Sequence, residues 1–243
     1  MKKKALVLIH GFPFDSSMWD EQKAFLKNFC DVHAPDLPGF GESKISACSS
    51  IEDFAKFIKQ YVEEEKLGRV FLCGFSMGGY IAFAFYEMFT QFVEALIFAD
   101  TRVKDDSPEG KKGRDLAIRN AEIYGTDFFV KNMPEKLLSK ENLENDLILS
   151  KVKSIISKQK KESIINALIA MRERKDRSFL LQKIDIPSLF ICGEKDILST
   201  PEEMREMSKA VKNSRFEIVK NAGHLSNIEN SSQFNTILLD FLK

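Results

Sequence analysis

The chain has few histidines and cysteines, no long apolar run and no excess of charge of one sign. Its 243 residues contain 36 Lys and Arg against 36 Asp and Glu, so the formal net charge is zero. Binding to a polyanion needs a surplus of positive charge, and the balance therefore disfavours nucleic-acid partners. The apolar stretch near the N-terminus, residues 5–9, is too short for a secretory leader or a membrane span.

The cysteines and histidines also argue against two kinds of site. None of the four cysteines forms a CxxC pair, and Cys73 and Cys192 stand within apolar runs, where a free thiol behaves as a small apolar side chain. We therefore expect a reducing, cytoplasmic setting. The three histidines are spread over the whole chain, which disfavours a histidine-built metal site.

Short apolar runs alternate with helix-like stretches along most of the chain. Unbroken apolar runs separated by helices are typical of parallel strands that are covered on both faces. This pattern predicts an α/β fold with about six mostly parallel strands and helices on both faces of the sheet. The expected strands are residues 5–9, 32–34, 70–73, 95–99, 188–192 and 216–219.

Two helix starts carry specific signals. Residues 51–67 place apolar side chains at three- and four-residue steps, and Ser50 with Asp53 forms a capping box before them. The pair Thr200 and Pro201 supplies an N-cap and a proline at the first helical position, so a second helix is expected there.

Between residues 101 and 183 the strand-like runs vanish and several helical stretches follow one another, with breaks near Gly125, Pro134 and Ser157. A helical segment of this length between two strands is typical of a cap over one end of a sheet. We expect a cap over residues 103–182, inserted before the penultimate strand of a core formed by residues 1–102 and 183–243.

Positive charge is concentrated in one part of this segment. Residues 151–177 contain nine Lys and Arg against three Asp and Glu. A charge run usually marks a solvated helix face, here opposite apolar residues such as Ile164 and Leu168. The alternative is a docking surface for a partner, which would require a contiguous exposed patch.

The segment Gly74-Phe75-Ser76-Met77-Gly78-Gly79 is the most informative one. It follows an apolar run and opens the apolar helix of residues 80–89. A nucleophile elbow requires a serine on a tight strand-to-helix turn, flanked by glycines because a Cβ would collide with neighbouring backbone. Ser76 is therefore predicted to be a nucleophile. The alternative is a glycine-rich helix start with an inert serine.

A serine nucleophile needs a general base within hydrogen-bonding reach. His10 ends the first strand directly before a turn, and His33 lies within a short strand. His224 instead follows the last strand, where an imidazole can project over the carboxyl edge of the sheet. It also completes the chain order serine, acid, histidine expected with this elbow, so His224 is the predicted base.

The base in turn needs a carboxylate that orients it. Asp196 and Asp100 both follow expected strands. We favour Asp196, because Asp100 is better placed to anchor the turn into the cap. Acyl transfer also needs two N–H groups aimed at the developing oxyanion. The start of the helix after the serine offers the N–H of Met77, and the loop after the first strand offers that of Phe12.

Five segments together resemble the α/β-hydrolase superfamily: HGFPFDSSMW, DLPGFGES, GFSMGG, GEKD and NAGH, in this order from residue 10 to residue 224. Within it the chain resembles small soluble carboxylesterases and enol-lactonases. The resemblance implies hydrolysis of a small ester or lactone through an acyl-enzyme on Ser76, with His224 as base, Asp196 as acid and an oxyanion hole from Phe12 and Met77. It implies no metal or organic cofactor, and a monomer or homodimer.

Other members of this superfamily leave alternatives open. A serine at position 76 argues against haloalkane dehalogenases and epoxide hydrolases, which carry aspartate there. Lactonases, C–C hydrolases, perhydrolases and the menaquinone-pathway synthase keep the serine, although Tyr80 stands where that synthase has arginine. A receptor-like, ligand-binding member without turnover is the non-enzymatic alternative. Because few residues precede the first strand, the two leading strands of the larger fold are not expected.

Overall fold

A six-stranded sheet forms the centre of the molecule. The computed structural model describes residues 3–46 and 48–243. The strand order is β2-β1-β3-β4-β5-β6, and every neighbouring pair is parallel, which confirms the predicted α/β class. The strands are β1 (Ala5–Ile9), β2 (Asp31–His33), β3 (Val70–Phe75), β4 (Val93–Ala99), β5 (Ser188–Gly193) and β6 (Ser214–Val219).

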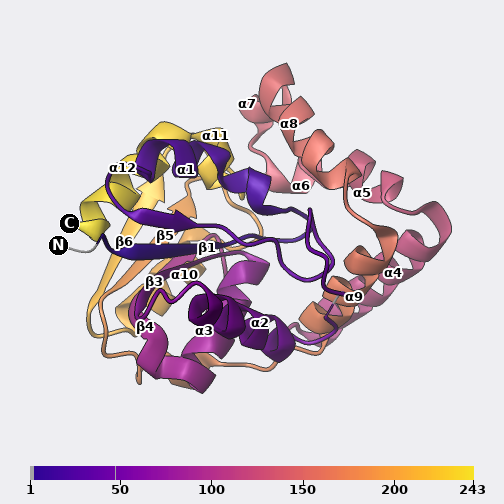
Figure 1. Ribbon diagram of the computed structural model, residues 1–243. Coiled ribbons are helices and arrows are strands. Elements are labelled where there is room, and N and C mark those ends of the chain that lie inside the picture. The colour runs from indigo at the N-terminus through magenta and orange to yellow at the C-terminus, as the bar shows by residue number, and fades with distance from the viewer. Residues whose placement is uncertain (1–2, 47) are drawn as a thin grey trace.

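Helices cover both faces of this sheet (Figure 1). Parallel strands are joined by right-handed crossovers. A helix that leads to a strand on one side along the sheet therefore lies on one face, and a helix that leads to a strand on the other side lies on the opposite face. One face carries α1 (Asp20–Leu26), α11 (Ser226–Glu229) and α12 (Ser231–Leu242), and the other carries α2 (Ile51–Glu64), α3 (Met77–Phe89) and α10 (Pro201–Lys209). Single 3-10 turns η1 (Ser16–Trp19), η2 (Thr90–Phe92) and η3 (Ser178–Leu180) complete the connections.

The expected helix starts are observed. The Ser50 hydroxyl accepts the N–H of Asp53 at 3.1 Å, and the Thr200 hydroxyl accepts that of Glu203 at 3.3 Å. The helix after the elbow begins at Met77 rather than at residue 80, because the turn at Ser76 is tight enough for its carbonyl to accept the N–H of Gly79 at 2.9 Å.

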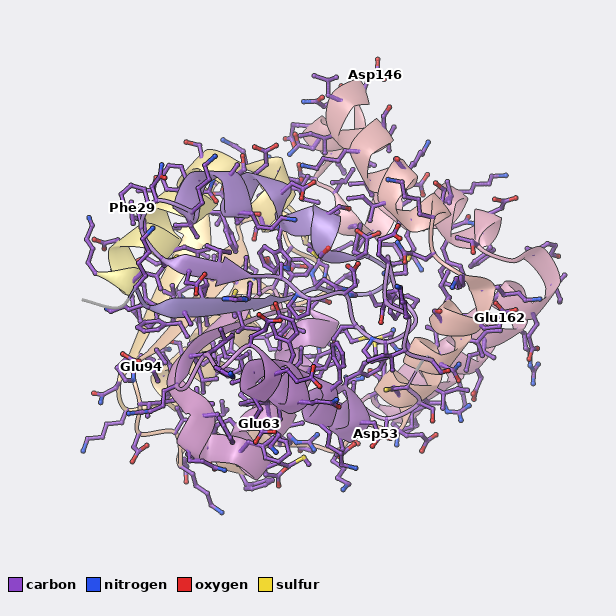
Figure 2. All side chains as sticks on the ribbon, in the orientation of Figure 1. Phe29, Asp53, Glu63, Glu94, Asp146 and Glu162 are labelled. Carbon is purple, nitrogen blue, oxygen red and sulfur yellow. The ribbon has the colours of Figure 1, made fainter. Side chains whose placement is uncertain are left out.

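Six helices lie between β4 and β5 in the chain and together form what we call the insertion. They sit beyond the carboxyl ends of the strands (Figure 1), and Asp146 and Glu162 mark the side of the insertion that faces away from the sheet (Figure 2). Breaks fall near the predicted positions. The helices are α4 (Pro108–Tyr124), α5 (Asp127–Asn132), α6 (Pro134–Leu137), α7 (Lys140–Leu143), α8 (Asp146–Ser157) and α9 (Lys161–Arg172).

The basic stretch of residues 151–177 was predicted to be a solvated helix face, and this is only partly correct. Most of its lysines are exposed, but the guanidinium groups of Arg174 and Arg177 are buried. Arg177 donates to Glu52 of α2 at 2.8 Å and to Glu87 of α3 at 3.0 Å. These ion pairs hold the end of the insertion against the helices of the sheet. A count of charges could not distinguish these buried arginines from solvated lysines.

None of the helices described is long and apolar enough to span a bilayer.

Candidate active site

Ser76 stands on a strained turn between β3 and α3. Its φ of 52° lies in the left-handed region, which residues other than glycine adopt rarely. A Cβ at Gly74 would lie 2.2 Å from the carbonyl oxygen of Gly78, and a Cβ at Gly78 would lie 2.3 Å from that of Ile9. The Thr101 hydroxyl donates to the carbonyl of Ser76 at 2.7 Å. The turn is therefore fixed by close backbone packing and by a threonine that sequence patterns did not single out.

Ser76, His224 and Asp196 form one hydrogen-bonded chain. The Nε2 atom of His224 lies 2.9 Å from Ser76 Oγ, and its Nδ1 lies 2.8 Å from Asp196 Oδ2. The other oxygen of Asp196 accepts the N–H groups of Leu198 at 2.8 Å and Ser199 at 3.1 Å. Since both oxygens of Asp196 accept, Nδ1 of His224 carries the proton and Nε2 is free to accept from the serine hydroxyl.

The other two histidines lie away from this chain. The buried ring of His10 donates from Nδ1 to the carbonyl of Gly11 at 3.0 Å and accepts the Leu37 N–H on Nε2, also at 3.0 Å. Desolvation by burial lowers the pKa of His10, so the ring is a neutral brace for the loop after β1. His33, on β2, contacts the hydroxyl of Tyr61 on α2 at 3.1 Å.

Asp100, the alternative acid considered from the sequence, is not hydrogen-bonded to His224. Its carboxyl is hydrogen-bonded to the Gly193 N–H at 2.7 Å and to the Ser226 hydroxyl. Ligand atoms of Asp100, Cys192 and Asp196 lie within 4.8 Å of one another, which is close enough to share an ion. The cluster does not fit a metal, because its carboxyl oxygens already have hydrogen-bond partners and burial raises the pKa of the Cys192 thiol far above its usual range.

Two backbone N–H groups beside Ser76 have no protein acceptor among the described residues, those of Phe12 and Met77. Met77 is the first residue of α3, so its N–H is one of those that every helix leaves unpaired at its start. The Phe12 ring packs edge-on against Phe129 of the insertion, with centroids 5.9 Å apart. The backbone of Phe12 is therefore free of intramolecular hydrogen bonds while its side chain closes one wall.

A cavity of about 460 Å³ opens onto Ser76 and His224, a volume that suits a small organic molecule. Its floor comes from the sheet edge and its roof from α4, α5, α6 and α9 of the insertion. Charged groups of Arg102, Asp106, Arg114 and Lys136 lie around it. Most of the lining is apolar and includes Phe12, Tyr80, Phe129, Leu137, Leu168 and Met171.

Tyr80, on the first turns of α3, lies beneath a buried guanidinium. The Arg174 group is 4.3 Å from the centre of the Tyr80 ring and 2.8 Å from an Asp106 oxygen. It also donates to the carbonyls of Lys104 at 3.1 Å and Met171 at 2.8 Å. The charge of Arg174 is thus engaged within the protein and does not face the cavity freely.

Glu229 of α11 ties the insertion to the loop that carries His224. One carboxylate oxygen accepts the Gly223 N–H at 2.8 Å, and the other accepts the Ser139 N–H and the Asn142 side-chain amide, each at 2.8 Å. A Cβ at Gly223 would lie 2.6 Å from the Ser139 nitrogen, so only glycine permits this approach. We call the segment from α6 to α7, which includes Ser139 and Asn142, the α6–α7 rim. This rim packs directly against the loop that carries His224.

The fold and this geometry define a class. Residues 4–128 and 165–231 match the family model of the α/β hydrolase fold, and the chain belongs to this family. A thermophilic esterase from Thermogutta terrifontis, with malate bound, is similar at a TM-score of 0.95 and 32% identity, over 99% of this chain and 90% of that one.

Two further relatives show how varied the activities of such chains are. The enol-lactonase from Burkholderia xenovorans LB400 has a TM-score of 0.91 and 25% identity, over 100% of this chain and 92% of that one. A Bacillus subtilis protein that carries the name of a 2-succinyl-6-hydroxy-2,4-cyclohexadiene-1-carboxylate synthase is 28% identical, over 98% of this chain and 90% of its own length. These matches confirm the resemblance to esterases and enol-lactonases seen in the sequence.

Proposed function

We propose that the chain is a serine hydrolase that cleaves small carboxylic esters through an acyl-enzyme on Ser76. The observation that carries this proposal is the hydrogen-bonded chain from Ser76 through His224 to Asp196, with the serine at the floor of a largely apolar cavity. The similarity to a solved esterase at 32% identity supports the choice of ester as substrate.

The geometry supports a definite order of steps. His224 Nε2 takes the proton of Ser76 as the serine oxygen attacks the ester carbonyl, and Asp196 stabilises the imidazolium that forms. The N–H groups of Phe12 and Met77 hold the oxyanion. The imidazolium then protonates the departing alcohol. A water activated by His224 attacks the acyl-enzyme and releases the acid, so these steps need no metal or organic cofactor.

We assign residues 103–182 to a helical cap on a core formed by residues 1–102 and 183–243. The cavity supports this division, because its floor belongs to the core and its roof to helices α4, α5, α6 and α9. In this arrangement the core supplies the reacting groups and the cap shapes the site that receives the acyl or alcohol part of the substrate.

The test is to label the nucleophilic serine covalently with a reagent that takes the place of the acyl group. A fluorophosphonate probe reacts only with an activated serine, and we expect one label on the peptide that contains Ser76, together with turnover of p-nitrophenyl butyrate. The Ser76→Ala variant should take no label. A label on another serine would refute the assignment, and ligand binding without label or turnover would support the receptor-like alternative.

A lactone is the second candidate substrate, favoured by the similarity to an enol-lactonase. The same serine, histidine and oxyanion donors open a cyclic ester, so kinetics on a matched panel of esters and lactones decides between them. The synthase activity is less well supported. Tyr80 replaces the arginine expected for it, and the nearby Arg174 is engaged by Asp106 and by backbone carbonyls.

Gly113 of α4 offers a way to measure the depth of the acyl site. It lines the cavity, and an added Cβ would meet no atom within 4 Å, so a larger side chain can extend without a clash. In Gly113→Leu we expect the ratio of kcat/KM for p-nitrophenyl octanoate over acetate to fall by about tenfold or more, because the leucine occupies space that a long acyl chain needs.

The matched control for this change is Gly113→Ala, which removes the glycine but adds a single methyl group. Its octanoate to acetate ratio should stay within about twofold of the wild-type value. An unchanged chain-length profile in Gly113→Leu would show that the acyl chain lies in another part of the cavity.

A further inference from the structure

Asp100 is a fully buried residue that the steps above do not use. It directly follows β4 with a φ of 45°, in the left-handed region that residues other than glycine adopt rarely. Its N–H donates to the carbonyl of Ile191 at 2.9 Å, which pins this turn to β5. The carboxyl group is thereby held across the carboxyl end of the sheet.

The partners of this carboxyl lie on the two loops that carry Asp196 and His224. One oxygen accepts the N–H of Gly193, the last residue of β5, at 2.7 Å, shortly before the loop reaches Asp196. The other oxygen is hydrogen-bonded to the hydroxyl of Ser226, which follows His224 closely in the chain. Asp100 therefore connects three loops at the sheet edge where the reacting groups meet.

The charges around Asp100 are all negative or neutral. Among the described residues no Lys or Arg pairs with it, and the groups that face it are Asp196, the Cys192 thiol, Glu229 and the Ser226 hydroxyl. Burial, reinforced by the charge of Asp196, raises the pKa of Asp100 well above its usual range. The two carboxyl groups therefore lie close together in a buried site, where each is held by hydrogen bonds and neither is paired with Lys or Arg among the described residues.

We propose that Asp100 is a positioning residue that fixes the Asp196 and His224 loops relative to each other. One of its oxygens accepts from the Gly193 N–H and the other accepts from the Ser226 hydroxyl, so each loop is held by one bond. This inference rests on the proposed function, since the spacing matters only if Asp196 and His224 carry the reaction.

The first test is Asp100→Asn, because the amide has the same shape and can keep both links: its oxygen accepts from Gly193, and its NH₂ group can donate to the Ser226 hydroxyl oxygen. We expect kcat for p-nitrophenyl butyrate within about threefold of wild type. A loss as large as that expected for Asp100→Ala would overturn the positioning role, because it would show that the charge of Asp100 matters and not its bonds to the two loops.

The second test removes the bonds. In Asp100→Ala we expect kcat per labelled serine to fall about ten- to hundredfold with KM within about twofold, since a displacement of about 1 Å in a reacting group costs on that order. Ser226→Ala, which removes one bond only, should give a smaller loss of kcat and provides the test if Asp100→Ala does not fold.

Counting sites with the fluorophosphonate probe separates loss of folded protein from loss of rate. Asp185→Ala, an aspartate before β5 at the opposite end of the sheet, is the control and should keep the wild-type kcat. Wild-type kcat per site in both Asp100→Ala and Ser226→Ala would refute the positioning role and leave the proposed function standing. Absence of label and turnover in the wild type would instead refute the proposed function.

Discussion

Replacing His224 with alanine is expected to lower kcat for p-nitrophenyl butyrate by about 10⁴-fold or more, with KM changed by less than about threefold. The imidazole is the group within reach of the serine, at 2.9 Å from Ser76 Oγ, and without it the hydroxyl keeps its proton during attack. Release of the acid is slowed as well, because no base then activates the water that attacks the acyl-enzyme. Steady-state kinetics with saturating ester measures the loss.

The controls for this change use the other members of the site. Because the three residues act as a unit, the double variant Ser76→Ala/His224→Ala should be no slower than either single variant within about tenfold. His33→Ala removes a histidine of β2 that contacts Asp31 of the same strand and Tyr61 of α2, and should leave kcat unchanged. A His224→Ala enzyme that retained a tenth of the wild-type rate would exclude this residue as the base.

Replacing Asp196 with asparagine should lower kcat by about 10⁴-fold, although the two side chains have the same shape. One oxygen of Asp196 accepts two backbone N–H groups, so the amide oxygen of asparagine takes that place and its NH₂ group faces His224 Nδ1. The imidazole must then carry its proton on Nε2, where it points at Ser76. A base in that tautomer cannot accept the hydroxyl proton.

The result can be separated from a folding defect. Asp196→Asn should keep the unfolding temperature within a few degrees of wild type, since the backbone bonds to the amide oxygen remain, while the rate of fluorophosphonate labelling falls in parallel with kcat. Asp185→Asn is the matched control and should be fully active. Wild-type labelling of Asp196→Asn would show that another group orients the imidazole.

The sequence could predict the parts of this molecule that depend on local patterns. Unbroken apolar runs imply parallel strands, and the elbow around Ser76 places its serine at a strand-to-helix turn, because both features depend on neighbouring residues. The order of motifs then puts Asp196 and His224 at the same sheet edge, where the structure brings them within hydrogen-bonding distance of each other and of the serine.

The supporting polar residues could not be predicted in this way. Thr101, Asp100 and Glu229 each bond to segments far away in the chain, and nothing in their own surroundings in the sequence marks the partner. Arg174 and Arg177 are similar, because a buried arginine in an ion pair and a solvated one look alike in a count of charges. Such contacts follow from tertiary packing and not from periodicity.

The bridge formed by Glu229 has a consequence for how a substrate reaches the serine. Its carboxylate holds the α6–α7 rim and the imidazole-bearing loop in one piece through three charged hydrogen bonds. Swinging that rim outward would drag the base out of alignment at the moment of binding. A substrate therefore has to reach Ser76 without displacing the α6–α7 rim, and the open space beside Gly113 lies on α4, outside this bridge.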